Sequence, residues 1–335
     1  MPAADRHAYG QYFTPEPLID AVLSLVPPPD GVVLDFACGS GRFLLGAKRW
    51  GQPLRGFDTD PAALAAARAN LPGADLSSTD FLDAPARGDV ALIVGNPPYV
   101  RRRGQKRDLY VDFLERSAAH LKPGGRLALV LSNAWMDVGY GQAVRELLLS
   151  DFAVEWIIEG EERWFPSAKV NTVVLVARKG RGDVVRFGRI EALPGPVTEL
   201  RAVPQKDLPR DQPWGPWLRA PSPWFDVDRA SMPTLGDLAT VQRGFTTNDN
   251  GFYYPPADCG VEERWLRPLL KSPRRVRGFA FDPALLSDRV FVAPADVNDP
   301  GARAWIGQRE PRALVPLDPA RLFVFKGVHR DFRQP

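Results

Sequence analysis

The sequence predicts an α/β protein with a doubly wound, Rossmann-like sheet and a second, smaller C-terminal domain. Its first part alternates apolar runs with helical patterns, which is typical of parallel strands joined by crossover helices. A glycine-rich turn follows the first apolar run, at residues 39–41. The composition changes after residue 192, and 335 residues are enough for two domains.

The elements of the sheet domain follow one another in a regular order. Strands are predicted at 32–36, 54–58, 90–94 and 126–131, and the β-branched segments 154–158 and 170–177 are predicted as the last strands. Helices are predicted at 18–26, 40–50, 61–70 and 109–121. The Thr14 hydroxyl, ahead of Pro15, is expected to cap the first of these helices, and Asp60, ahead of Pro61, the third.

The domain boundary is predicted from proline content. Residues 193–224 contain eight prolines, a density that neither helix nor sheet tolerates, so this segment is predicted to be a linker docked by its tryptophans. Residues 1–192 then form the first domain. Residues 225–335, with short apolar runs, many turns and scattered arginines, form the second, mixed or β-rich domain.

Composition excludes several classes of protein. Hydrophobic residues make up 44% and charged residues 25%, as in ordinary globular proteins, and no stretch approaches the ~18 apolar residues of a membrane span. The first ten residues lack the apolar region of a signal peptide. Neither Cys38 nor Cys259 has partners at zinc-ligand spacing, so we expect a reducing, cytoplasmic setting and no metal site. The net charge of +3 permits a nucleic-acid partner without requiring one.

Two loops after predicted strands suit a nucleotide-like ligand. Glycines in Asp35–Gly41 let the backbone turn sharply and approach a ligand at the next helix, although a plain strand–helix turn has the same appearance. Asp58 stands at the tip of the second strand, where a carboxylate accepts hydrogen bonds from ribose hydroxyls. Its separation from Gly41 fits the roughly 20 residues that such folds use.

The most specific motif is Asn96-Pro97-Pro98-Tyr99, directly after the apolar strand 90–94. The two prolines fix the backbone and remove two N–H donors, which leaves carbonyl groups and the Asn96 amide oxygen as acceptors. An exocyclic amine has two N–H donors and needs two acceptors. Tyr99 adds a flat aromatic face for a base. A rigid turn that only ends a strand is the alternative.

Residues 10 to about 180 resemble the gamma-class N6-adenine DNA methyltransferases of bacterial restriction–modification systems. The resemblance rests on the order of the motifs, which are Gly10–Pro15, Asp35–Gly41, Asp58, Ser78–Leu82, Asn96–Tyr99, and Trp164–Pro166 followed by Lys169–Val173. It implies S-adenosylmethionine as cofactor, with Thr14 near the methionine carboxylate. Asp80 would accept from the cofactor adenine amine, and Phe81 would pack on that ring.

The resemblance also implies the residues of each site. The cofactor residues would be Thr14, Asp35, Ala37, Gly39, Asp58, Asp80, Phe81, Asn96 and Pro98. The catalytic residues would be Asn96, Pro97, Pro98, Tyr99 and Phe165, with the flipped adenine held between the rings of Tyr99 and Phe165.

Beyond the linker the resemblance is thinner. Gln242–Phe252 and Trp265–Lys271 resemble the opening of target-recognition domains, and an end at residue 335 indicates a compact or truncated one. Two basic clusters fit duplex DNA as the partner, although charge runs are usually solvated faces. They are Arg101, Arg102, Arg103 and Lys106 with Arg107, and Lys271, Arg274, Arg275 and Arg277. No nuclease-like acidic cluster precedes the first motif, so any restriction endonuclease is expected to be a separate partner.

The expected reaction is direct methyl transfer to the amine, with Asn96 and the Pro97 carbonyl stabilising the positive nitrogen of the transition state. Alternatives remain open: methylation of protein glutamine, of RNA adenine or of cytosine N4, or a non-catalytic DNA-binding subunit. The intact motif argues against the last. The sequence does not give the DNA recognition site or the oligomeric state.

Overall fold

The computed structural model describes residues 13–99, 108–165, 170–228, 232–233, 237, 250–269, 287–292 and 298–307. The chain divides into two compact units, Met1–Val227 and Asp228–Pro335.

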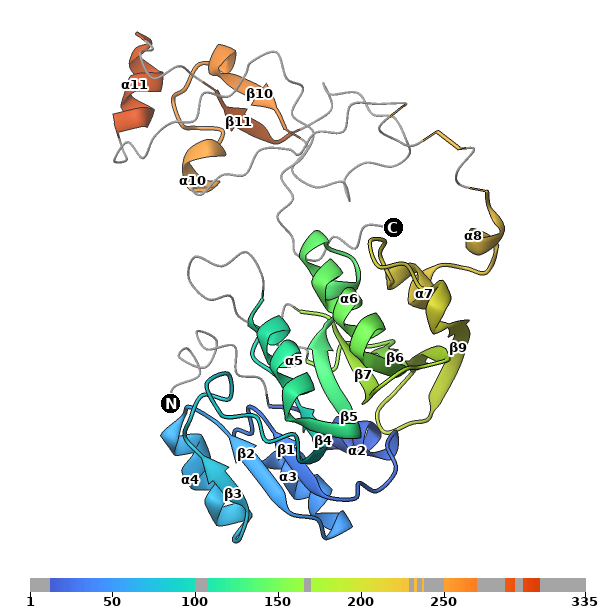
Figure 1. Ribbon diagram of the computed structural model, residues 1–335. Helices are drawn as coiled ribbons and strands as arrows, with labels where there is room; N and C mark the ends of the chain where they lie inside the picture. Colours follow the sequence, from blue (N-terminus) through green and yellow to red (C-terminus); the bar gives the residue numbers. More distant parts are fainter. Residues whose placement is uncertain are drawn as a thin grey trace. The chain divides into compact units, whose positions relative to one another are not determined.

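The first unit is built on one nine-stranded sheet in the order β3-β2-β1-β4-β5-β7-β6-β8-β9 (Figure 1). The strands from β3 to β5 pair in parallel, β7 pairs antiparallel with β5 and β6, and β9 pairs antiparallel with β8. The bounds are β1 Val32–Asp35, β2 Leu54–Phe57, β3 Asp75–Ser77, β4 Val90–Gly95, β5 Leu121–Ser132, β6 Phe152–Gly160, β7 Thr172–Lys179, β8 Val184–Ile190 and β9 Val197–Pro204. This arrangement confirms the doubly wound α/β class.

Helices cover both faces of this sheet because both faces are apolar. Along β5, Leu127, Leu129 and Leu131 belong to one buried cluster, whereas Ala128 and Val130 belong to the other. The first face is covered by α5 (Leu109–His120), α6 (Gln142–Asp151) and α7 (Gly215–Arg219). The second face is covered by α2 (Glu16–Ser24), α3 (Arg42–Ala47) and α4 (Pro61–Asn70).

The two predicted helix caps have different outcomes. Asp60 caps α4 as predicted, since its carboxylate accepts from the Ala62 amide at 2.9 Å. The prediction that Thr14 caps the first helix is wrong: α2 has Pro15 at its N-cap and no side-chain cap, and the Thr14 hydroxyl contacts Asn96 instead.

The prediction of a linker over residues 193–224 is also wrong. Residues 197–204 form β9, which pairs with β8 along its length and extends the sheet beyond the strands that we predicted to be the last. An edge strand tolerates proline at its ends, and Pro204 is the last residue of β9. Predicted tryptophan docking is confirmed for Trp214, which is fully buried against Trp135 with ring centroids 5.6 Å apart.

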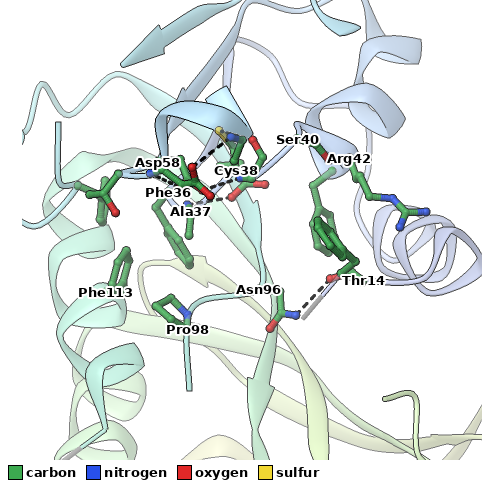
Figure 2. A pocket seen from close by; sticks show the side chains of 18 of the residues that line it. Thr14, Phe36, Ala37, Cys38, Ser40, Arg42, Asp58, Asn96, Pro98 and Phe113 are labelled. Carbon is green, nitrogen blue, oxygen red and sulfur yellow. Dashed lines mark hydrogen bonds between the residues drawn. The ribbon is translucent and has the colours of Figure 1, made fainter. Parts of the chain in front are cut away.

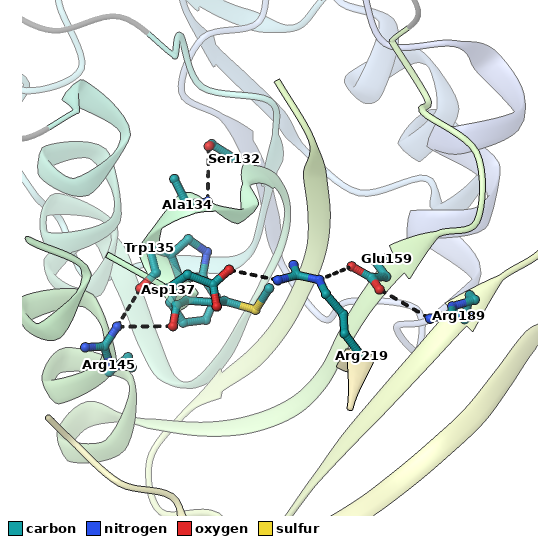
Figure 3. Close-up of polar contacts among 9 residues, drawn as sticks. Ser132, Ala134, Trp135, Asp137, Arg145, Glu159, Arg189 and Arg219 are labelled. Carbon is teal, nitrogen blue, oxygen red and sulfur yellow. Dashed lines mark hydrogen bonds and ion pairs between the residues drawn. The ribbon is translucent and has the colours of Figure 1, made fainter. Parts of the chain in front are cut away.

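Charged side chains fix this segment to the carboxyl edge of the sheet (Figure 3). Arg219 of α7 donates to Asp137 at 2.8 Å and to Glu159 of β6 at 3.1 Å. Arg189 at the end of β8 pairs with the same Glu159 at 3.5 Å. These ion pairs join α7 to the ends of β6 and β8 and to Asp137, within the unit that ends at Val227.

The described part of the second unit is small. Strands β10 (Leu266–Pro268) and β11 (Arg289–Phe291) form an antiparallel pair. The helices α10 (Asn250–Tyr253) and α11 (Pro300–Gly307) contribute Phe252 and Ala302 to a buried cluster with Phe291. The mixed composition that we expected for this part of the chain matches these elements.

Candidate active site

A cavity of about 480 Å³ opens where the carboxyl ends of β1, β2 and β4 meet (Figure 2). Asp35 ends β1, Asp58 follows β2 and Asn96 follows β4, and all three border the cavity. Parallel strands bring their carboxyl ends to one edge of a sheet, so residues far apart in sequence share one wall there.

The glycine loop after β1 is tied to the tip of β2 by Asp58. One carboxylate oxygen of Asp58 accepts from the Gly39 amide at 2.7 Å and the other accepts from the Asp60 amide at 2.9 Å. Gly41 ends the loop with a positive φ of 84°, and a Cβ there would lie 2.7 Å from Leu71. Asp58 therefore shapes the loop, and each of its oxygens keeps a second lone pair for a ligand hydroxyl.

Aromatic rings form the apolar part of the cavity lining. Phe36 lies 5.5 Å from Phe81 and 5.1 Å from Phe113 between ring centroids, and all three border the cavity. Asp80, beside Phe81, accepts from the Leu82 amide at 3.0 Å. The combination of a flat apolar surface with carboxylates suits a nucleoside.

Asp35 is a buried carboxyl group in the cavity wall. It is 2% exposed and accepts from the Ala37 amide at 3.1 Å. Burial raises the pKa of Asp35 to about 8, and the nearby negative charge of Asp58 adds to this shift. Gly95, with φ of 148°, leaves room for it, since a Cβ there would lie 2.8 Å from the Asp35 oxygen.

The Asn96 carboxamide is held at both ends. Its Nδ2 donates to the Thr14 hydroxyl at 3.2 Å, and its Oδ1 accepts from the Tyr99 hydroxyl. Tyr99 also lies 2.9 Å from the carbonyl oxygen of Val130 on β5, and burial raises the pKa of its phenol. The motif is thus anchored to the neighbouring strand.

Tyr99 and Phe165 pack in different clusters. Tyr99 packs against the cluster that contains Tyr110, with the two rings 6.4 Å apart and edge to face. Phe165 is 5% exposed and belongs to the cluster on the α2 and α3 face. Their pairing around a target base stays a prediction.

The predicted cofactor residues come together. All of them border the cavity, namely Thr14, Asp35, Ala37, Gly39, Asp58, Asp80, Phe81, Asn96 and Pro98. Sequence reasoning missed Phe36, Leu109 and Phe113, which also border it. Leu109 and Phe113 are four residues apart on α5, so they share a helix face. Their spacing in the first helix after Asn96–Tyr99 is the sequence signal that could have identified them.

Both predicted basic clusters lie outside the described residues, as do Lys169 and Pro166. Within the described part of the chain, no group of three or more His, Cys, Asp or Glu side chains is arranged to hold a metal ion. No described helix has the length and apolar character needed to cross a membrane.

Comparison with known proteins finds methyltransferases as relatives. Residues 72–165 match the model of the Eco57I restriction-modification methylase family. The chain is 26% identical over 335 residues to Type II methyltransferase M.XamI of Xanthomonas campestris pv. amaranthicola, covering 87% of this chain and 62% of that protein. It is 31% identical over 305 residues to Type II methyltransferase M.TthHB8I of Thermus thermophilus, covering 80% of this chain and 66% of that protein.

The fold is shared with a larger enzyme. The type IIG restriction endonuclease BpuSI superposes with a TM-score of 0.56 at 16% identity, over 91% of this chain and 46% of that one. The chain spans less than two thirds of the length of M.XamI. With the matched family model, the two Type II methyltransferase relatives and the carboxyl-edge cavity together, the chain belongs to the restriction–modification methyltransferases, which take their methyl group from S-adenosylmethionine.

Proposed function

We propose that this chain transfers the methyl group of S-adenosylmethionine to the N6 amine of an adenine in duplex DNA. The observation that carries the proposal is the position of Asn96. It borders the cavity that suits the cofactor, and both ends of its carboxamide are held, by Thr14 and by Tyr99. An amide oxygen held in this way is a preorganised acceptor for an amine.

The cavity fits S-adenosylmethionine in its chemistry. Asp58 offers carboxylate oxygens to the ribose hydroxyls, and Asp80 offers one to the adenine amine. Phe36, Phe81 and Phe113 offer ring surface to the adenine. Asp35 and Thr14 remain for the methionine end, with the negative and polar groups that its charges require.

The bound cofactor supplies a methyl group made electrophilic by a positive sulfur. The residues of the chain act on the other reactant. The lone pair of adenine N6 is delocalised into the ring, and hydrogen bonds to Asn96 Oδ1 and the Pro97 carbonyl would draw electron density back to the nitrogen. The cofactor sulfur would be the leaving group: it would keep the electron pair of the S–C bond as the amine nitrogen takes the methyl group. The amine then loses one proton to solvent.

The adenine must leave the base stack to reach this site, because the cavity lies inside the edge of the sheet. We assign the selection of the DNA site to the second unit. Its relation to recognition domains rests on sequence resemblance, and the two Type II methyltransferase relatives align over more of the chain than the first unit alone.

The direct test is transfer of labelled methyl to mixed genomic duplex DNA, followed by digestion and analysis of nucleosides. We expect N6-methyladenine as the only labelled base. Labelled N4-methylcytosine would correct the base. Label in RNA or in a protein glutamine, with none in duplex DNA, would replace this function by one of its alternatives.

Asn96→Ala separates catalysis from cofactor binding. We expect loss of methyl transfer, with cofactor affinity in calorimetry changed by only a few-fold, because the amide oxygen acts on the target amine. The matched variant is Asp58→Ala, which should weaken cofactor binding by roughly 1–3 kcal/mol through unpaired ribose hydroxyls. Methylation at the wild-type rate by Asn96→Ala would exclude this mechanism.

A further inference from the structure

Arg42 is the one basic side chain among the described residues that border the cavity. It is the first residue of α3, and it is exposed. The other charged side chains of this lining are carboxylates, those of Asp35, Asp58, Asp60 and Asp80. Arg42 is therefore the charge in the described lining that suits a negative group of a ligand.

The guanidinium group of Arg42 is available to such a ligand. No hydrogen bond or ion pair joins Arg42 to another residue in the described part of the chain. The carboxylates, in contrast, already accept from backbone amides, as Asp58 does from Gly39 and Asp60 from Ala62. A guanidinium group offers N–H donors in a planar fork that matches a carboxylate. A ligand carboxylate would thus meet Arg42 without breaking an ion pair inside the protein.

The position of Arg42 indicates which part of the cofactor it meets. The carboxylate of the methionine part is the negative group of S-adenosylmethionine. With adenine assigned to Asp80 and ribose to Asp58, methionine takes the remaining end of the cavity. Figure 2 shows Arg42 and Thr14 on one side of the view and Asp58 on the opposite side. Arg42 therefore belongs with the residues that are left for methionine.

The charges of the cavity and of methionine are then complementary. The positive sulfur and amine of the cofactor suit the carboxyl group of Asp35, which is 2% exposed in the cavity wall. The cofactor carboxylate would be repelled by the acidic side chains of the same lining if no cation faced it. Arg42 supplies that cation among the described residues.

We infer that Arg42 binds the methionine carboxylate of the cofactor and is a specificity-determining residue for ligands that carry this group. The inference rests on the proposed function in one respect, the assignment of adenine and ribose to Asp80 and Asp58. Because Arg42 is exposed, the ion pair contributes a modest part of the affinity, and salt screens it.

The test compares two ligands by calorimetry on the full chain. They are S-adenosylhomocysteine and its decarboxylated analogue, which keeps the amine and has hydrogen in place of the carboxylate. Arg42→Gln keeps a polar side chain and removes the charge. We expect its affinity for S-adenosylhomocysteine to fall about fivefold, the upper end for an exposed ion pair, with the affinity for the analogue unchanged. Arg42→Lys keeps the charge and should retain most of the preference for the carboxylate.

The matched control is Arg87→Gln, the same change at an exposed position that does not border the cavity. Both affinities should stay at the wild-type values in this variant. Salt gives a readout that needs no variant. The preference of the wild type for S-adenosylhomocysteine over the analogue should shrink between about 0.05 M and about 0.5 M salt, because an exposed ion pair is screened.

Equal loss of affinity for both ligands in Arg42→Gln, or a wild type that does not prefer S-adenosylhomocysteine, overturns the inference. Unchanged ligand affinities with weaker binding of duplex DNA also overturn it, and would make Arg42 a phosphate contact. None of these measurements uses a methyl acceptor. Labelled methyl in RNA or in a protein glutamine, with none in duplex DNA, would therefore refute the proposed function and leave the role of Arg42 standing.

Discussion

Asp35 is a cavity residue whose pKa is strongly shifted. Burial raises its pKa to about 8, so at neutral pH the carboxyl group of the ligand-free protein is mostly protonated. S-adenosylmethionine carries positive charges on its sulfur and amine. A cation beside Asp35 favours the ionised form, so binding should release a proton.

We therefore expect cofactor affinity to rise with pH between pH 6 and about 8 and to level off above that value. The limiting slope is about tenfold per pH unit, since one proton is released. Calorimetry across this range, in buffers of different ionisation enthalpy, measures both the slope and the proton. Asp35→Asn cannot ionise and should bind with little pH dependence; an equal slope in this variant would assign the proton to another group.

His120 is a second buried residue whose pKa is shifted. It is 1% exposed, and its ring lies 4.6 Å from that of Phe81. Burial, with the positive charges of Arg116 and Arg55, lowers the pKa of His120 to about 4. The folded protein therefore holds a neutral imidazole under the cavity wall.

A lowered histidine pKa destabilises the fold in acid. Above pH 6.5 both states hold neutral imidazole, and as the pH falls toward about 4 the unfolded state gains the proton first. Relative to His120→Gln, the free energy of unfolding of the wild type should fall by about 1.4 kcal/mol per pH unit in that window. Denaturant titrations at pH 7.5, 6, 5 and 4.5 measure it; parallel curves for the two proteins would show that His120 titrates normally.

The sequence predicted which residues border the cavity better than it predicted the contacts between them. Asp58 and Asn96 follow strands, and strand order alone brings them to one edge. The contact between Thr14 and Asn96 joins residues 82 positions apart, and no local pattern encodes it. The same threonine looked like a helix cap because Thr-Pro-Glu has the composition of one, and tertiary contact decided otherwise.

At the scale of elements, β9 and α7 show why the proline content of residues 193–224 did not predict their structure. Three prolines of this segment lie at the ends of elements, and the others lie in the turns between elements. Pro204 ends β9, and Pro216 lies in the first turn of α7, where a missing N–H costs nothing. The pairing of β9 with β8 and the ion pairs of Arg219 are long-range contacts, which composition does not report. The long apolar strands β4 and β5 were predictable because each is buried on both faces.

The packing of α7 beside Asp137 requires a glycine at position 215. A Cβ on Gly215 would lie 2.0 Å from Asp137 Oδ1. The other oxygen of the same carboxylate, Oδ2, pairs with Arg219. Gly215→Ala should therefore displace Asp137 and lower the free energy of unfolding by about 1–3 kcal/mol, as overpacked sites do. Gly139→Ala is the matched control, since nothing lies within 4 Å of its Cβ position. Equal stability of the two variants would show that α7 is not held in this way.

At the scale of the whole molecule, the candidate active site lies within Met1–Val227. This unit contains the nine-stranded sheet, both large buried clusters and every described residue that borders the cavity. The second unit has its own small clusters around Phe252 and Leu269. Cofactor binding and selection of the DNA site are thus expected to be separable.

A chain ending at Val227 tests that division. Because the two large buried clusters lie within it, we expect it to unfold cooperatively and to bind S-adenosylmethionine with an affinity within a few-fold of the full chain. It should lose methylation of duplex DNA, since Lys271, Arg274, Arg275 and Arg277 and the segment that resembles recognition domains are removed. Thermal unfolding, calorimetry and labelled-methyl transfer measure the three properties on the same preparation. Duplex methylation at the rate of the full chain would show that the first unit selects its own DNA, and loss of cofactor binding would show that the second unit completes the cavity.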